Sequence, residues 1–309
     1  MNDNLGISVI VDNHPRFFCE YVLWVLCAKD SLSIPKRVYF INNKHESLIR
    51  FSRKNGIDVK FADQLIPEAP HCNKLIPFLD EDKFENQIVS DTDLFFSRDV
   101  ACFFSSDLVR LPPNNHASPP LSIFEKLYKF AKFNKTPELG TALFEGENSR
   151  ETFKGNVSAG LIFIPKKLNY AAKLWYERAK WLSENKTILG RFANHVDQVS
   201  FAMMVHQHDI PFSHLPAQTN AILELLPQIQ SVYGFHLTSG HLPNFKHFLN
   251  KDKTLNSDII NSSIRTDCEF INKRILKSIE LLYKMPETSG FVENFLNSDW
   301  RRGEASSHI

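Results

Sequence analysis

The sequence predicts an α/β protein with a mixed, mostly parallel sheet and a helical extension at its C-terminal end. Its 309 residues are 43% hydrophobic and 12% aromatic, which is enough to build a large buried core. Short apolar runs alternate with longer helical runs along the first half, and this alternation is typical of parallel strands joined by helices. We therefore expect one domain over residues 1–250 and a helical extension over residues 251–309.

Strands in the first half are expected where short apolar stretches are bounded by polar or turn residues. They are residues 7–12, 37–42, 59–62 and 87–91. Helices are expected between them, where the stretches are longer, at residues 16–30, 44–56 and 73–80. Gly56 is expected to stop the second helix, and Pro77 to interrupt the third.

The second half begins with a segment of different character. Residues 112–150 open with PPNNHASPP and are too long for a simple connection, so we expect an insertion that covers the site. Its basic, aromatic run FEKLYKFAKFNK has two interpretations, binding of an acceptor or a solvated helix with one buried face.

Regular patterns return after this insertion. The expected elements are a strand at 156–166, helices at 169–185 and 194–208, a strand at 212–216 and an amphipathic helix at 268–285. Residues 301–309 are expected to be disordered.

Charge and cysteine content argue against several classes of function. Lys and Arg number 36 against 35 Asp and Glu, so binding of nucleic acid is not expected as the main function. The five cysteines are irregularly spaced and form no C-x-x-C pair, so we expect neither a disulfide framework nor a zinc site. We expect neither a signal peptide nor a membrane-spanning helix, and therefore a cytoplasmic protein.

Two aspartates at the end of an expected strand are the strongest sign of chemistry. Asp91 and Asp93 lie one residue apart in QIVSDTDLFF, at the strand end where ligands bind in parallel sheets; Asp12 stands at another such end. Two carboxylates this close require a shared proton or a cation between them. Hard oxygen ligands favour magnesium, manganese or calcium, and the first two are often shared with nucleotide phosphates. The alternative is a simple turn.

Further motifs occur in a consistent order along the chain. They are ISVIVDNHPRFFCEYVLWVL, CNKLIPFLD, VSDTDLFF, VSAGLIFIPKK, VDQVSF and FHLTSGHLPNF. With these motifs the chain resembles nucleotide-sugar glycosyltransferases of the GT-A (Rossmann-like) fold, most closely the glycogenin and lipopolysaccharide galactosyltransferase type, over residues 6–250. The resemblance implies a hexosyltransferase that uses Mn²⁺ or Mg²⁺ and a nucleotide sugar, with a UDP-sugar preferred, and that retains the anomeric configuration.

The resemblance also implies roles for particular residues. Asp91, Asp93 and His236 would hold the metal, with His241 as the competing histidine. The nucleotide sugar would contact Asp12, Asn13, Lys74, Asp91, Ser158, Gly160 and Gly240. Asp197 and Gln198 would lie at the reacting sugar, with Asp197 holding its hydroxyl groups in position. The acceptor is expected to be a glycan, a lipid-linked sugar, a protein or a small metabolite.

The sequence departs from the family pattern near its late motif. His236 precedes Gly240 by four residues rather than three, and Ser158 stands where asparagine is usual. No K-P-W triplet follows, so the phosphate-binding lysine of the family has no clear counterpart. Two of the other motifs also have purely structural interpretations. In one, Asn194 is a helix cap and Asp197 an acid of the first helical turn; in the other, the small residues at 158–160 serve close packing.

Three other functions fit parts of the pattern. A nucleotide-sugar-binding protein without turnover is compatible with the missing K-P-W. A sugar nucleotidyltransferase would need a glycine-rich phosphate loop, and VDNHPRFF contains no glycine. A phosphohydrolase of the haloacid dehalogenase type would carry its D-x-D near the N-terminus, whereas here about 90 residues precede it.

Overall fold

The computed structural model describes residues 4–104, 107–146, 149–222, 231–236 and 266–290. The chain divides into two compact units. Unit 1 comprises Met1–Ile10, Ala62–Asp91 and Cys102–Ala217, and unit 2 comprises Val11–Phe61, Thr92–Ala101 and Gln218–Ile309. The chain therefore passes from unit 1 to unit 2 between Asp91 and Thr92, in the middle of the D-x-D motif.

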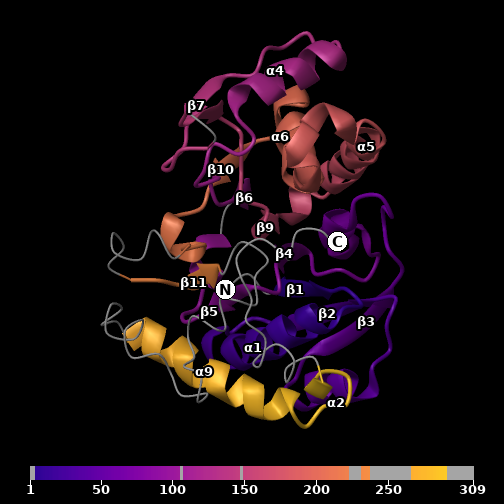
Figure 1. The fold of residues 1–309 in the computed structure, drawn as a ribbon, viewed down its shortest axis with the longest axis vertical. Helices are drawn as coiled ribbons and strands as arrows, with labels where there is room; N and C mark the ends of the chain where they lie inside the picture. The colour runs from indigo at the N-terminus through magenta and orange to yellow at the C-terminus, as the bar shows by residue number, and fades with distance from the viewer. Residues whose placement is uncertain (1–3, 105–106, 147–148, 223–230, 237–265, 291–309) are drawn as a thin grey trace. The chain divides into compact units, whose positions relative to one another are not determined.

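A seven-stranded sheet has the strand order β10-β6-β9-β4-β1-β2-β3 (Figure 1). Its strands are β1 (Leu5–Val11), β2 (Lys36–Ile41), β3 (Asp58–Ala62), β4 (Asn86–Ser90), β6 (Val109–Leu111), β9 (Leu161–Ile164) and β10 (Phe212–His214). Strand β1 runs parallel to β4 and β10 parallel to β6, whereas β9 is antiparallel to both β4 and β6. The expected mixed, mostly parallel α/β sheet is confirmed.

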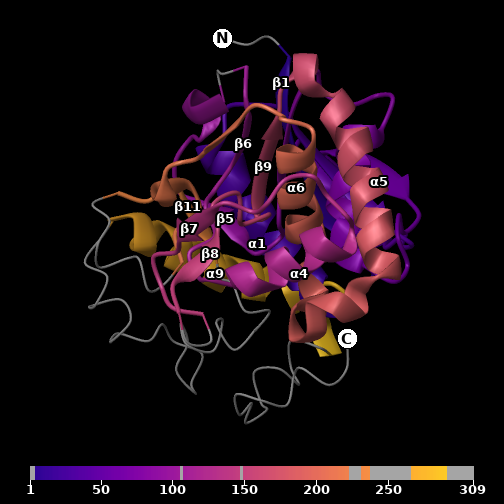
Figure 2. The ribbon, with the colours of Figure 1, turned by 90° about the horizontal axis from the view of Figure 1, so that it is seen from above.

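The core of unit 1 lies between this sheet and two helices, α5 (Tyr170–Glu184) and α6 (Val196–Gln207), which pack side by side next to β9 and β6 (Figure 2). All four side chains of β9 are buried, as a strand covered on both faces requires. Helix α6 is buried continuously from Val196 to Val205. Each large apolar side chain removed from water in this way contributes about 1.5–3 kcal/mol.

The core of unit 2 is built around α1 (Pro15–Ser31), and among the residues described there α2 (Glu46–Lys54) and α9 (Thr266–Leu282) are further helices. Pro15 opens α1, and the His14 side chain accepts a hydrogen bond from the Arg16 amide, so the first turn is capped. The side chains of α1 are buried on nearly all faces of the helix, as its apolar sequence predicts. Helix α9 packs along α1 (Figure 1), where Arg274 pairs with Asp30.

Unit 2 contains a two-stranded sheet whose first strand directly follows the D-x-D motif in the chain. Strand β5 (Leu94–Phe96) pairs antiparallel with β11 (Gly234–His236), and the register places His236 opposite Leu94. All six residues of the two strands are buried. This pairing brings a histidine from late in the chain next to the residues that follow Asp91.

The insertion contains α4 (Leu121–Phe130) and β7 (Leu139–Thr141), which pairs with β8 (Glu151–Phe153). Phe124, Leu127 and Tyr128 form the buried face of α4. The Phe124 and Tyr128 rings pack on the Phe153 ring at 5.1 and 6.1 Å between centroids. The helix therefore has one buried face, which is one of the two interpretations of the basic, aromatic run. That the insertion covers the site stays a prediction.

Several expected boundaries differ from the structure. The strand expected at 156–166 is confined to Leu161–Ile164, because backbone groups of the preceding residues bond elsewhere. Pro77 does not interrupt a helix; it lies in the first turn of α3 (Ile76–Leu79), where its missing N–H costs nothing, and a 3₁₀ turn, η1 (Pro70–Leu75), precedes it.

The helix expected at 194–208 begins at Val196, after His195, so Asn194 is not its cap. The five strands β5, β6, β7, β8 and β11 were not expected as separate elements, and residues 301–309 lie outside the described ranges. Among the described residues, none of the helices is long and apolar enough to cross a membrane.

Candidate donor and metal site

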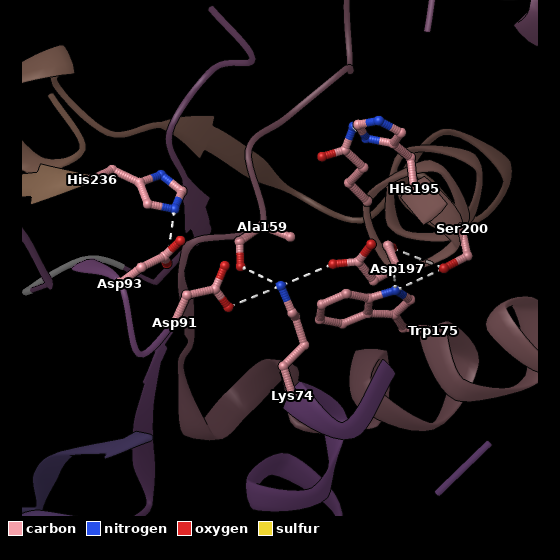
Figure 3. A network of polar contacts seen from close by, with 10 residues as sticks. Lys74, Asp91, Asp93, Ala159, Trp175, His195, Asp197, Ser200 and His236 are labelled. Carbon is pink, nitrogen blue, oxygen red and sulfur yellow. Dashed lines mark hydrogen bonds and ion pairs between the residues drawn. The ribbon is translucent and has the colours of Figure 1, made fainter. Parts of the chain in front are cut away.

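A buried lysine is the centre of the site in unit 1. Lys74, on η1, has a side chain that is 9% exposed, and its ammonium nitrogen has three oxygen partners (Figure 3). The nitrogen lies 3.0 Å from Asp91 Oδ1, 2.8 Å from Asp197 Oδ2 and 3.1 Å from the Ala159 carbonyl oxygen. An ammonium carries three N–H donors, so this arrangement uses its full hydrogen-bonding capacity.

The charges of this cluster stabilise one another. Burial acts to lower the pKa of Lys74, but the attraction of Asp197 and then of Asp91 outweighs it, so its pKa is raised. Burial acts to raise the pKa of Asp197, and the Lys74 ammonium more than offsets this, so the pKa of that carboxyl is lowered. Lys74 and Asp197 are therefore a charged pair at neutral pH.

Asp197 is held in place by the first turn of α6. The Trp175 indole nitrogen donates to the Asp197 carbonyl oxygen at 2.9 Å and to Ser200 Oγ at 3.0 Å (Figure 3). Ser200 Oγ also donates to the Asp197 carbonyl at 2.9 Å. Asp197 is the acid of the first helical turn, as one interpretation expected, and it also pairs with Lys74. Its role in holding sugar hydroxyls stays a prediction.

Gln198 connects the start of α6 to the insertion. Its amide nitrogen lies 3.2 Å from the Ser118 carbonyl oxygen and 2.6 Å from His195 Nδ1. Asn156 donates to the same Ser118 carbonyl at 3.3 Å. Burial lowers the pKa of His195, which favours the neutral ring. A contact between Gln198 and a sugar therefore stays a prediction, and the amide already positions the loop at Ser118.

Residues 158–160 supply backbone groups. The Ser158 amide donates to the Pro112 carbonyl at 2.9 Å, and the Gly160 carbonyl accepts from the Asp91 amide at 2.9 Å. The Ala159 carbonyl accepts from Lys74. These residues fix the position of Asp91 relative to Lys74, and the predicted contacts of Ser158 and Gly160 with the donor stay predictions.

The unit 2 part of the site is formed by Asp93 and His236. The His236 Nε2 atom lies 3.3 Å from Asp93 Oδ1, and the two side chains are 8% and 16% exposed (Figure 3). The antiparallel pairing of β5 with β11 produces this contact, since Asp93 immediately precedes β5. Gly240 and His241, the other residues predicted from the late motif, lie outside the described residues.

Asp91 is joined to Asp93 through Thr92 alone, so the chain itself keeps the two carboxylates together. One ligand atom each from Asp91, Asp93 and His236 can be chosen so that all lie within 4.8 Å of one another. Two carboxylates and an imidazole form a ligand set that suits a divalent cation, as the D-x-D spacing predicted.

A third acid, Glu20, lies beneath this turn and was missed by the sequence reasoning. Burial raises the pKa of Glu20 to about 6, and the nearby charge of Asp93 adds to this, while Arg16 and the Thr92 hydroxyl act against it. A signal was available, since Glu20 is the sole charged residue between Arg16 and Lys29 in an otherwise apolar helix.

Asp12 and Asn13 form the turn after β1. The Asp12 carbonyl accepts from the His14 amide at 2.8 Å. Asn13 Nδ2 donates to the Asn42 carbonyl at 3.2 Å, and Asn13 Oδ1 lies 3.1 Å from His45 Nε2. These bonds tie the turn after β1 to the turn after β2 within unit 2. The predicted contact of Asp12 and Asn13 with a nucleotide base stays a prediction.

No protein-family model and no curated protein matches this chain, but solved structures do. The galactosyltransferase LgtC, solved with donor and acceptor sugar analogs, shares 12% identity over 88% of this chain and 95% of its own, with a TM-score of 0.51. The chain has the GT-A glycosyltransferase fold. The glycosyltransferase GlyE of Streptococcus pneumoniae shares 13% identity over 89% of this chain and 64% of its own, also with a TM-score of 0.51.

Mouse xyloside xylosyltransferase 1 also matches, at 13% identity over 76% of this chain and 97% of its own, with a TM-score of 0.45. The similarity to LgtC and GlyE confirms the fold that the sequence resemblance implied.

Proposed function

We propose that this GT-A fold protein is a metal-dependent glycosyltransferase that moves a sugar from a nucleotide diphosphate sugar, preferably a UDP-sugar, to an acceptor. The observation that carries the proposal is the group formed by Asp91, Asp93 and His236, because it stands at the end of a parallel strand in this fold. LgtC, which shares the fold, was solved with donor and acceptor sugar analogs. The acceptor is proposed to be a glycan, a lipid-linked sugar or a protein.

The three side chains fit a divalent cation by their chemistry. Asp91 and Asp93 offer hard carboxylate oxygens and His236 offers a nitrogen, which tilts the choice from magnesium toward manganese. Three protein ligands fill only part of a six-coordinate shell, and diphosphate oxygens complete such shells in other proteins. When bound, the cation would supply positive charge to the departing diphosphate.

The chain's own residues would prepare the sugar for transfer. Lys74 keeps Asp197 ionised, so the Asp197 carboxylate can accept hydrogen bonds from sugar hydroxyls and hold the ring in one orientation. Gln198, which follows Asp197 in the chain, holds the loop at Ser118, and His195 contacts the Gln198 amide nitrogen. Retention of configuration is proposed from the family resemblance, and the cytoplasm stays the predicted compartment.

Release of UDP tests the proposal directly. The protein is incubated with UDP-glucose, UDP-galactose and UDP-N-acetylglucosamine in manganese chloride, and matched samples contain EDTA. We expect UDP release from at least one donor in manganese and none in EDTA. GDP-mannose is the control for the nucleotide, and no GDP should be released from it. Absence of release from every donor would leave the transferase proposal without support.

Thermal unfolding of the same samples separates the alternative functions. A ligand that binds only the native protein at 100 times its Kd adds about 2.7 kcal/mol of stability. Manganese-dependent stabilisation by a donor without UDP release would favour a binding protein without turnover. Formation of a UDP-sugar from UTP and a sugar phosphate would favour a nucleotidyltransferase.

A further inference from the structure

We propose that Glu20, with Arg16, is a positioning residue that sets the geometry of the Asp91–Thr92–Asp93 turn for its cation. This inference rests on the proposed metal site and extends it to a buried pair on α1 that contacts no substrate. It concerns unit 2, which contains Glu20, Arg16, Thr92 and Asp93.

Both carboxylate oxygens of Glu20 have a donor. The Thr92 hydroxyl donates to Oε2 at 2.6 Å, and the Arg16 Nε donates to Oε1 at 2.8 Å. Glu20 and Thr92 are both buried, each at 5% exposure. The residue between the two metal-binding aspartates is therefore fixed to a helix by a short, solvent-shielded hydrogen bond.

The placement of this bond follows from the helix. Arg16 and Glu20 are four residues apart, so they lie on one face of α1, and the pair forms within the helix. The same helix packs against β5, the strand that follows the turn, and its last residue, Ser31, donates to the Phe96 carbonyl at 3.0 Å. Thus α1 anchors both the turn and the strand that leads away from it.

The charges on α1 also balance those of the turn. Burial acts to lower the pKa of Arg16, but the charges of Glu20 and Asp93 outweigh it and raise that pKa. Arg16 therefore offsets the negative charge that Glu20 adds beside Asp93. A buried carboxylate is costly in an apolar helix, and a leucine at this position would avoid the cost but would give Thr92 no acceptor.

Groups that orient metal ligands have a measurable effect on metal affinity. Loss of such an outer partner typically weakens metal binding by about 10–100-fold. Thr92→Val keeps the shape of the side chain and removes the donor, whereas Thr92→Ser keeps the hydroxyl. We therefore expect Thr92→Val to weaken manganese binding by about 10–100-fold and Thr92→Ser to bind nearly as the wild type does.

The test is calorimetric titration of manganese into the full-length protein in the presence of UDP. Thr152→Val is the matched control, because Thr152 is also buried and its hydroxyl donates to the Pro119 carbonyl at 2.7 Å, within unit 1. Its manganese affinity should equal that of the wild type. Thermal unfolding without metal shows which variants are folded.

Each outcome decides the inference. Weak binding by folded Thr92→Val, rescue by Thr92→Ser and normal binding by Thr152→Val support it. Wild-type affinity in folded Thr92→Val overturns it and leaves the proposed function intact, whereas a wild type that binds no manganese overturns both. If Thr92→Val does not fold, Glu20→Leu decides in its place, since leucine gives the Thr92 hydroxyl no acceptor; an affinity within about twofold of wild type in the folded variant then contradicts the inference.

Discussion

Replacing Lys74 by methionine is expected to destabilise the protein by about 3–5 kcal/mol, the cost of removing one partner from a buried ion pair. The Lys74 ammonium forms ion pairs with Asp197, whose side chain is 8% exposed, and with Asp91, whose side chain is 32% exposed. Without it, Asp197 must keep an uncompensated charge out of water or take up a proton. Because Asp91 is more accessible to solvent, most of the loss comes from Asp197.

Urea unfolding followed by circular dichroism measures this change in the free energy of unfolding. Lys154→Met is the matched control, since Lys154 pairs with Glu138 at 2.9 Å while their side chains are 70% and 59% exposed. An exposed pair of this kind contributes about 0–1 kcal/mol. The double variant Lys74→Met with Asp197→Asn should recover part of the loss, because it removes the stranded charge. A Lys74 variant no less stable than the Lys154 variant would refute this description of the cluster.

Converting Asp93 to asparagine is expected to remove metal-dependent binding of the donor. The change deletes a charged ligand and the contact of Asp93 with His236. Loss of a group that only orients a metal ligand weakens metal binding by up to about 100-fold, so loss of the ligand itself should lower UDP affinity in manganese by at least about 100-fold. In EDTA, wild type and variant should bind UDP equally weakly.

Calorimetry with UDP and manganese measures this loss. Asp107→Asn is the control, because Asp107 is 79% exposed and pairs with Lys167 at 2.8 Å on the surface of unit 1. Its UDP affinity should match the wild type. Unchanged affinity in Asp93→Asn would show that the D-x-D pair does not hold the metal that binds the donor.

Much of the fold follows from apolar patterning. Strands such as β1 and β4 and helices such as α1 and α5 were predicted within a few residues, because each is long enough to show its own period. The strands β5 and β11 were missed, since three residues carry no period. Their pairing joins positions about 140 residues apart, and such a non-local contact has no signal in a single sequence.

The residues of the candidate site were also predicted only in part. The D-x-D pair, Lys74 and Asp197 were singled out from motifs, but the ion pair between Lys74 and Asp197 depends on how η1 and α6 pack within unit 1. Glu20 was overlooked because its helix was considered for its apolar character alone. A lone acid in an apolar helix predicts a buried partner, and Thr92 and Arg16 are the partners here.

Anomalous diffraction from a crystal grown with manganese and UDP would locate the cation and identify its ligands. We expect a manganese peak within bonding distance, about 2.0–2.3 Å, of carboxylate oxygens of Asp91 and Asp93 and of His236, with the diphosphate on the same ion. A crystal with UDP and manganese bound elsewhere, and with these three side chains contacting neither, would contradict it.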